Sequence, residues 1–202
     1  LAERDLIEAS DFSHVRTISM GSAPASDVLL GDISAVFKNA AIQLNYGTTE
    51  GGPIMLGWYH PDGLERPVGA VGDPIPGCEY RFEGGPNDKQ GELVLRNPGV
   101  ALGFYNYPEE TERCFKDGWN YSGDIMRQDE DGWFYFVGRV DDMFVCGGEN
   151  IFPGQVESLL EKFARISQAV VLPFSHETKG EVPYAFVVAE KGATLGEDDV
   201  KA

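Results

Sequence analysis

The feature that most restricts the fold of this chain is a change in its hydrophobic pattern near residue 66. Before that point, strand-like runs at 17–20 and 41–44 flank a helix-like segment at 26–38. From about residue 66 to residue 139, short β-rich runs such as GELVLRN and GWFYFVG are separated by clusters of Gly, Pro, Asn and Asp. The pattern predicts an α/β segment over 1–65 and a small β-barrel-like subdomain over 66–139.

The pattern changes again after residue 139, where helix and strand signals alternate. Strand-like DMFVC and the loop GGEN precede a helix that begins near Pro153. Its expected apolar face comprises Val156, Leu159, Leu160 and Phe163. AVVLPF and PYAFVVAE predict a hairpin packed on this helix, and LGEDDVKA predicts the start of a further helix. We therefore expect an α/β (α+β) protein in which residues 140–202 form a separate small α+β domain.

Composition excludes several classes of partner. A formal net charge of -17 repels nucleic acid and anionic membrane surfaces. No run reaches the roughly 18 apolar residues that a membrane span needs. The three cysteines, Cys78, Cys114 and Cys146, are widely spaced and favour free thiols in a reducing cytoplasm over a disulfide framework or a zinc site. The oligomeric state is not indicated.

The segment YGTTEGG, which follows the short run at 41–44, combines groups suited to a nucleotide. Tyr46 offers an aromatic face, Gly47 a flexible backbone, and Thr48 and Thr49 offer hydroxyls. Glu50 adds one carboxylate, an oxygen ligand of the kind that Mg²⁺ prefers. Gly and Thr after a strand also form ordinary turns, so the segment alone leaves both interpretations open.

Two further polar residues stand at the ends of β-rich runs. Asp124 follows Gly123, and Arg139 follows Gly138. A carboxylate accepts and a guanidinium donates hydrogen bonds, so the two could hold ribose hydroxyls; a plain surface salt bridge explains them equally well.

The order of motifs identifies a resemblance. MGSAPAS, NYGTTE, GELVLRNPGVALGFYNYPEET, GWNYSGD and GRVDDMFVCGGENIFPGQVE resemble the adenylate-forming (AMP-binding) superfamily in sequence and in spacing. The form GGENIFP resembles acyl-CoA synthetases, that is, carboxylate:CoA ligases. The resemblance implies that residues 1–139 are the C-terminal part of a large AMP-binding domain and that residues 140–202 are an incomplete small domain.

The resemblance also implies a role for each matching position. The backbone at Gly21, Ser22 and Ala23 would line the adenine and acyl pocket, and Tyr46 would pack on adenine beside Gly47 and Thr48. Thr49 would contact the α-phosphate, and Glu50 would bind Mg²⁺; we expect these two to be catalytic. Asp124 and Arg139 would bind ribose, and Asp141 would be the hinge. Gly147 and Gly148 would line the tunnel for CoA.

The implied reaction joins a small carboxylic acid to CoA through an acyl-adenylate; ATP is consumed, AMP and pyrophosphate are released, and Mg²⁺ is the cofactor. Fatty, aryl and branched acids remain open. The phosphate-gripping loop and the adenylation lysine of the family match no segment here, so we expect the isolated chain to be inactive. Two alternatives stay open: an acyl-adenylate former that loads a carrier protein, and a non-catalytic nucleotide-binding fragment.

Overall fold

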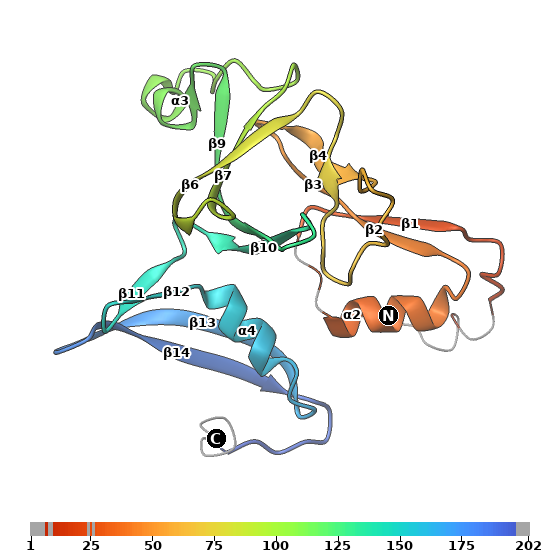
Figure 1. The fold of residues 1–202 in the computed structure, drawn as a ribbon. Helices are drawn as coiled ribbons and strands as arrows, with labels where there is room; N and C mark the ends of the chain where they lie inside the picture. The colour runs from red at the N-terminus through yellow and green to blue at the C-terminus, as the bar shows by residue number, and fades with distance from the viewer. Residues whose placement is uncertain (1–6, 8–9, 24, 26, 197–202) are drawn as a thin grey trace. The chain divides into compact units, whose positions relative to one another are not determined.

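The computed structural model describes residues 7, 10–23, 25 and 27–196. Contacts divide the chain into two compact units. The first comprises 1–122 and 127–136, and the second comprises 123–126 and 137–202. The boundary falls within β9 (Trp119–Gln128) and β10 (Phe134–Arg139), which are neighbouring strands of one sheet (Figure 1).

The first unit begins with a strand, a helix and a second strand. β1 (Thr17–Met20) and β2 (Ala41–Leu44) pair in parallel, with Thr17 opposite Ala41 and Met20 opposite Leu44. A parallel pair needs a crossover connection, and α2 (Asp27–Val36) supplies it. Both predicted strands are confirmed, and the predicted helix is confirmed with slightly narrower limits. Leu30 is the buried residue of α2.

A three-stranded sheet follows directly. β3 (Tyr46–Thr48), β4 (Gly52–Trp58) and β5 (Asp73–Pro74) lie in that order, and the pairs are antiparallel. Met55 and Leu56 on β4 are fully buried. The sheet therefore anchors the YGTTEGG segment, which forms β3 and the turn into β4, on the core of the first unit.

The β-rich part forms an open sheet. Its strand order is β10-β9-β7-β6, with β8 paired to β9. The elements are β6 (Glu79–Asn87), β7 (Gln90–Arg96), α3 (Pro108–Cys114), β8 (Phe115–Lys116), β9 (Trp119–Gln128) and β10 (Phe134–Arg139). The predicted strand-rich α/β architecture is confirmed, and across the described residues the strands form four separate sheets and no closed barrel.

Apolar side chains of this sheet build the core. Leu93, Val94 and Leu95 are successive residues of β7, and all are fully buried, which shows that both faces of this strand are covered. On one face, the ring of Phe134 lies 4.9 Å from that of Tyr80 and 6.0 Å from that of Phe82, centroid to centroid. These aromatic contacts join β6 and β10, the two ends of the strand order, across one face of the sheet.

The second unit is a sheet with one helix. β11 (Phe144–Cys146), β12 (Glu149–Ile151), β13 (Ile166–His176) and β14 (Gly180–Ala189) form a sheet in the order β12-β11-β14-β13. α4 (Pro153–Leu160) packs on β13, which confirms the prediction that the hairpin packs on this helix. Carboxylates near its C-terminal end cover the outer edge of β13: the N–H of Val171 donates to Glu157 Oε1 at 2.8 Å, and that of Ala169 to Glu161 Oε1 at 3.4 Å.

The predicted apolar face of α4 is only partly correct. The helix ends at Leu160, so Phe163 lies beyond it, and Leu159 is 61% exposed. A helix of eight residues makes only about two turns, so the face that it presents to β13 is short. Residues 197–202, where the sequence predicts a further helix, lie outside the described residues. None of the described helices is both long enough and apolar enough to cross a membrane.

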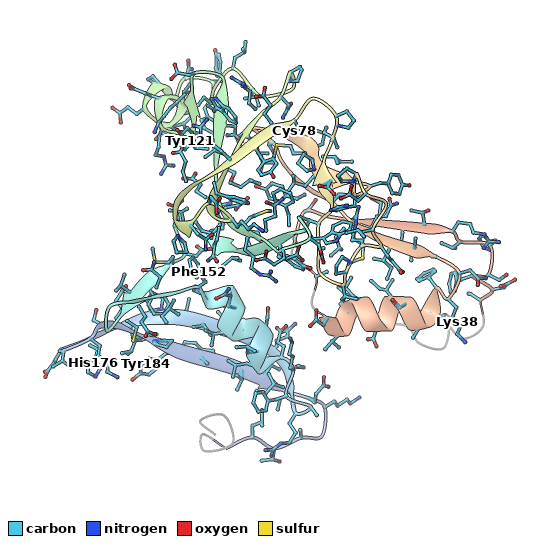
Figure 2. All side chains as sticks on the ribbon, in the orientation of Figure 1. Lys38, Cys78, Tyr121, Phe152, His176 and Tyr184 are labelled. Atoms are coloured by element: carbon cyan, nitrogen blue, oxygen red, sulfur yellow. The ribbon has the colours of Figure 1, made fainter. Side chains whose placement is uncertain are left out.

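The hairpin of β13 and β14 has two apolar faces with different surroundings. Ala169 and Val171 point to the buried face, where they are 8% and 2% exposed. The opposite face carries six large apolar side chains, each between 42% and 54% exposed: Val170, Leu172, Phe174, Tyr184, Phe186 and Val188. Tyr184 is labelled in Figure 2. Along β13 and β14, successive side chains point to opposite faces, and both faces carry apolar residues. This pattern is typical of strands that are covered on both faces.

Neighbouring valines on β13 give a test of this assignment. Val171→Ala should lower the free energy of unfolding by about 2 kcal/mol, because it removes two buried methyl groups. Val170→Ala, the matched control, should cost less than about 1 kcal/mol, since Val170 is 50% exposed. Urea unfolding of the two variants measures the difference. Equal losses would contradict the assignment of the buried face.

Candidate functional site

Two loops meet at the carboxyl ends of β1 and β2. The backbone N–H of Asn45 donates to Met20 O at 2.7 Å, and its side-chain Nδ2 donates to Ser19 Oγ at 2.6 Å. A Cβ on Gly21 would lie only 2.9 Å from the carbonyl oxygen of Asn45. Gly21, Ser22 and Ala23 are exposed, and Ser22 has a positive φ of 71°. The structure thus places this predicted loop beside the start of YGTTEGG, at the edge where open α/β sheets bind ligands.

The YGTTEGG segment forms β3 and a tight turn. Tyr46, Gly47 and Thr48 lie on β3 and are half-buried, Thr49 is exposed at the turn, and Glu50 is half-buried. A Cβ on Gly47 would come within 2.3 Å of the carbonyl oxygen of Pro53. Only glycine allows β3 and β4 to approach this closely.

The turn at Glu50 is held by a distant loop that sequence reasoning missed. Asn97 Nδ2 donates to Gly51 O at 2.8 Å, and the N–H of Ala101 donates to Glu50 O at 2.7 Å. Within the turn, the N–H of Gly51 donates to Thr48 Oγ1 at 2.9 Å. The available signal was a polar residue directly after the strand-like run GELVLR, although nothing in the sequence says which loop it contacts.

Asp124 and Arg139 lie together in the second unit. Arg139 Nη1 donates to Asp124 Oδ1 at 2.9 Å; the Asp124 side chain is 7% exposed and that of Arg139 is 47% exposed. Gly123 has a φ of 70° and leaves room for the Arg139 side chain, because a Cβ at this position would lie 3.2 Å from Arg139 Nη2. The salt bridge that the sequence left as an alternative does form, but its carboxylate is buried. A carboxylate accepts and a guanidinium donates hydrogen bonds, so the pair offers the two kinds of group that a polyhydroxyl ligand could contact.

The remaining predicted positions in the second unit lie in exposed turns. Val140 donates its N–H to Gly123 O at 2.8 Å, and Asp141 follows in the turn after β10. Gly147 and Gly148 join β11 to β12 with positive φ values of 59° and 94°, and a Cβ at either would meet no described atom within 4 Å. These two glycines serve the turn conformation and leave open space beside the backbone.

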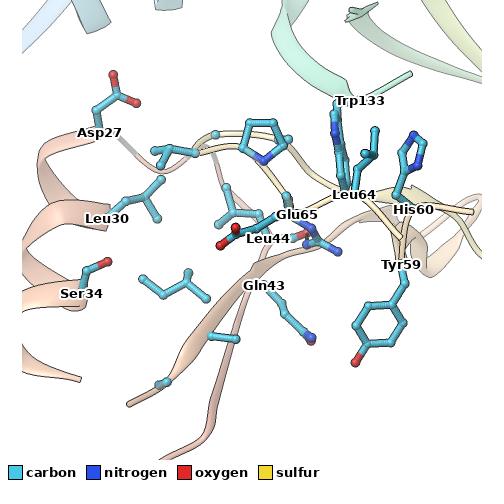
Figure 3. Close-up of a pocket in the computed structure, with 18 of the residues that line it drawn as sticks. Asp27, Leu30, Ser34, Gln43, Leu44, Tyr59, His60, Leu64, Glu65 and Trp133 are labelled. Carbon is cyan, nitrogen blue, oxygen red and sulfur yellow. Dashed lines mark hydrogen bonds between the residues drawn. The ribbon is translucent and has the colours of Figure 1, made fainter. Parts of the chain in front are cut away.

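A pocket of about 540 Å³ lies between α2 and the segment 64–70 of the first unit. In Figure 3, Leu30 and Ser34 point from α2 toward the segment that carries Leu64 and Glu65, and His60 and Trp133 lie to one side. None of the described site residues at 21–23 or 46–50 lines it. The pocket is therefore distinct from the two loops described above.

Arg66, which lines this pocket, and Asp73 are both partly buried. Arg66 donates from Nη1 to Leu44 O at 2.7 Å and from Nη2 to Gly57 O at 2.9 Å, and burial lowers its pKa although Asp73 opposes that shift. Burial also raises the pKa of Asp73, an effect that His60 and Arg66 oppose. Asp73 Oδ2 is buried and has no hydrogen-bond partner in the described part of the chain. Arg66 thus fastens β2 to β4 through backbone carbonyls.

One acidic side chain of the site, that of Glu50, could hold a metal ion together with the phosphate groups of a bound ligand. Within the described residues, no three His, Cys, Asp or Glu side chains are grouped so that they could hold a metal ion. Mg²⁺ commonly takes one or two protein carboxylates, with phosphate oxygens and water completing its shell. Glu50, at the turn beside the exposed Thr49, fits that pattern as a single protein ligand.

Comparison with known families gives two matches. Residues 1–105 match the family described as AMP-binding enzyme, and residues 155–202 match its C-terminal domain. The first match covers more than half of the chain and includes both loops of the first unit.

Individual relatives agree with these matches. The chain is 34% identical over 210 residues to 4-coumarate–CoA ligase 2 of Nicotiana tabacum, covering all of this chain and 39% of that protein. The o-succinylbenzoate CoA synthetase of Bacillus subtilis, solved with ATP and magnesium ion, is 28% identical with a TM-score of 0.78, over 96% of this chain and 41% of that one. The amide bond synthetase McbA of Marinactinospora thermotolerans is 28% identical with a TM-score of 0.81, over 100% and 42%. The chain thus spans about two fifths of the length of these relatives.

A closely packed glycine, Gly47, and a glycine beside open space, Gly31, together test the geometry of the first unit. Gly47→Ala should destabilise the protein by about 2 kcal/mol or more, because its Cβ would meet backbone atoms of Pro53 that cannot rotate away. Gly31→Ala, inside α2 and free of described atoms within 4 Å, should instead stabilise by about 0.5–1 kcal/mol. Thermal unfolding of both variants measures these signs. A neutral Gly47→Ala would mean that β3 and β4 are not in close contact.

Proposed function

Because the chain belongs to the AMP-binding enzyme family, we propose that its parent enzyme activates a carboxylic acid with ATP and transfers the acyl group to CoA. The carboxylate first attacks the α-phosphorus of ATP, giving acyl-adenylate and pyrophosphate. The CoA thiolate then attacks the acyl carbon and releases AMP. The first step is needed because a free carboxylate is a poor electrophile, whereas its mixed anhydride with AMP has a good leaving group.

The substrate class that we propose is an aromatic carboxylic acid. Several curated relatives at 31–34% identity are named 4-coumarate–CoA ligases, and the o-succinylbenzoate CoA synthetase has also been solved with its acyl-adenylate. Both names describe acids that carry an aromatic ring. Fatty and branched acids are the alternatives that a substrate panel tests.

The main support for nucleotide binding is the meeting of two loops at the carboxyl ends of β1 and β2. The backbone at Gly21, Ser22 and Ala23 would line the adenine side, and Tyr46 would pack on the base beside Gly47 and Thr48. Thr49, exposed at the turn, would donate to the α-phosphate. Fixed donors at a phosphate stabilise the charge that develops as the acyl oxygen attacks.

Glu50 is the proposed protein ligand for Mg²⁺. Its turn is fixed by hydrogen bonds to Glu50 O and Gly51 O, so the carboxylate starts from an ordered backbone. When bound, the metal would neutralise phosphate charge and favour pyrophosphate as the leaving group.

Asp124 and Arg139 are the proposed ribose ligands. Asp124 Oδ1 accepts from Arg139 Nη1 at 2.9 Å, and because a carboxylate can accept several hydrogen bonds, Asp124 would also accept from the ribose hydroxyls. Arg139 would hold Asp124 in orientation and donate to the ribose from its exposed side.

The transfer to CoA would use the second unit. Gly147 and Gly148 would pass beside the pantetheine chain, since neither carries a side chain to fill that space. Asp141, in the turn after β10, is the proposed hinge for the change between adenylation and thioester formation.

A second candidate follows from the similarity to an amide bond synthetase, which covers the whole chain. The parent would then pass its acyl-adenylate to an amine. Loading of a carrier protein and nucleotide binding without catalysis also remain as alternatives. The acceptor separates these reactions, because each gives a different acyl product from the same adenylate.

Product analysis of the enzyme that contains this chain tests the proposal. With ATP, Mg²⁺, CoA and a panel of aromatic, straight-chain and branched acids, we expect acyl-CoA and AMP to form in equal amounts, fastest with an aromatic acid. Mass spectrometry of the thioester and chromatography of the nucleotides measure both. Formation of ADP, or of amide without thioester, would contradict the proposal.

The ribose assignment predicts a specific change in ligand preference. Asp124→Ala should weaken AMP binding by about tenfold or more, because charge-assisted hydrogen bonds to the ribose are lost. The affinity for 2′,3′-dideoxy-AMP, which lacks both hydroxyls, should change little. Calorimetric titration measures both ligands, with Glu79→Ala, which breaks the Glu79–Arg96 ion pair, as control. If both ligands weaken equally, Asp124 does not bind ribose.

A further inference from the structure

The loop that follows β7 is fastened to the turn of Glu50 from a distance of 46 residues along the chain. We propose that Asn97 on this loop is a positioning residue that holds the Glu50 turn in the conformation that binds the magnesium nucleotide. This inference rests on the proposed function, since Glu50 matters to catalysis only if it holds the metal.

Two hydrogen bonds join the loop and the turn side by side. Asn97 Nδ2 donates to Gly51 O at 2.8 Å, and the N–H of Ala101 donates to Glu50 O at 2.7 Å. They engage the carbonyls of two successive residues. The same loop therefore holds two successive peptide groups, the one between Glu50 and Gly51 and the one between Gly51 and Gly52.

The orientation of the Asn97 amide is itself determined. Asn97 Oδ1 accepts the N–H of Gly99 at 2.7 Å, a short-range turn contact. With the oxygen engaged there, the nitrogen of the amide is directed at Gly51 O. A side chain that only accepted hydrogen bonds could keep the Gly99 contact but not the bond to the turn.

Packing leaves the turn little freedom to adapt. Gly51 is buried, and a Cβ on it would meet Met55 Sδ at 2.4 Å and Asn120 Oδ1 at 2.9 Å. Its N–H is held by Thr48 Oγ1. If Gly51 O were pushed outward, the displacement would pass to Glu50, which precedes it and is only half-buried.

This arrangement explains how Asn97 would act without touching the nucleotide. A metal ligand binds best when its backbone is already in place, because ordering it on binding costs free energy. Asn97 would supply that order to Glu50. Its loss should therefore affect magnesium nucleotide more than CoA, which would be bound by other residues.

The sharpest variant is Asn97→Asp. It keeps the oxygen that accepts from Gly99 and replaces the donor nitrogen by an oxygen facing Gly51 O. Asn87→Asp is the matched control, because Asn87 Oδ1 accepts the N–H of Lys89 at 2.9 Å in the same two-residue geometry, and Asn87 is exposed on the hairpin of β6 and β7.

Two measurements test the proposal. In the 202-residue chain without metal, hydrogen exchange followed by NMR should show about tenfold faster exchange of the Gly51 and Ala101 amides in Asn97→Asp than in Asn87→Asp. In the complete enzyme, the Mg²⁺ concentration for half-maximal rate should rise by about tenfold in Asn97→Asp, with an unchanged KM for CoA.

The outcomes are distinct. Equal exchange rates and equal Mg²⁺ dependence in the two variants would overturn the role of Asn97. Faster exchange without any change in Mg²⁺ dependence would make Asn97 purely structural and would also overturn it. If Asn97→Asp does not fold, Asn97→Ala, which removes the donor without opposing two oxygens, should show the same changes. A parent enzyme that forms no acyl-CoA would instead refute the proposed function.

Discussion

Parallel pairing of β1 with β2 is the constraint on which the candidate site of the first unit depends. Because the two strands run in the same direction, the loops that follow them leave the sheet at the same edge. The hydrogen bond from Asn45 N–H to Met20 O continues the pairing beyond Met20 and Leu44. It also places Gly21 beside Asn45, directly before the YGTTEGG segment. An antiparallel pair would place these loops at opposite ends.

The second unit reaches its candidate site by a different route. Asp124 and Arg139 come from neighbouring strands 15 residues apart, and their side chains form an ion pair whose carboxylate is buried. Removing Arg139 would take the guanidinium away from a buried carboxylate, so Arg139 helps to hold Asp124 in this arrangement. Positive φ at Gly123 is part of the same arrangement, because a side chain there would press against Arg139.

Sequence reasoning located these features to different degrees. The strands at 17–20 and 41–44 and the loops after them could be predicted, since short apolar runs and the Gly-rich turns that end them are local signals. The hydrogen bond from Asn97 to Gly51 could not be predicted, because contact between two loops 46 residues apart depends on how the sheets pack. For the same reason the sequence overestimated α4: periodicity indicated Phe163, but the chain turns to enter β13 after Leu160.

Glycine is used in these loops for two opposite physical reasons. At Gly47 and Gly51 a Cβ would collide with neighbouring atoms at less than 3 Å, so glycine permits close packing and a rigid turn. At Gly147 and Gly148 a Cβ would meet no described atom, and glycine permits instead a left-handed backbone beside open space. Rigidity suits a residue that must present a metal ligand in one position, whereas open space suits a loop that must admit a long, flexible substrate. The environment of each glycine therefore distinguishes the positions expected to hold still during adenylation from those expected to accommodate the acceptor.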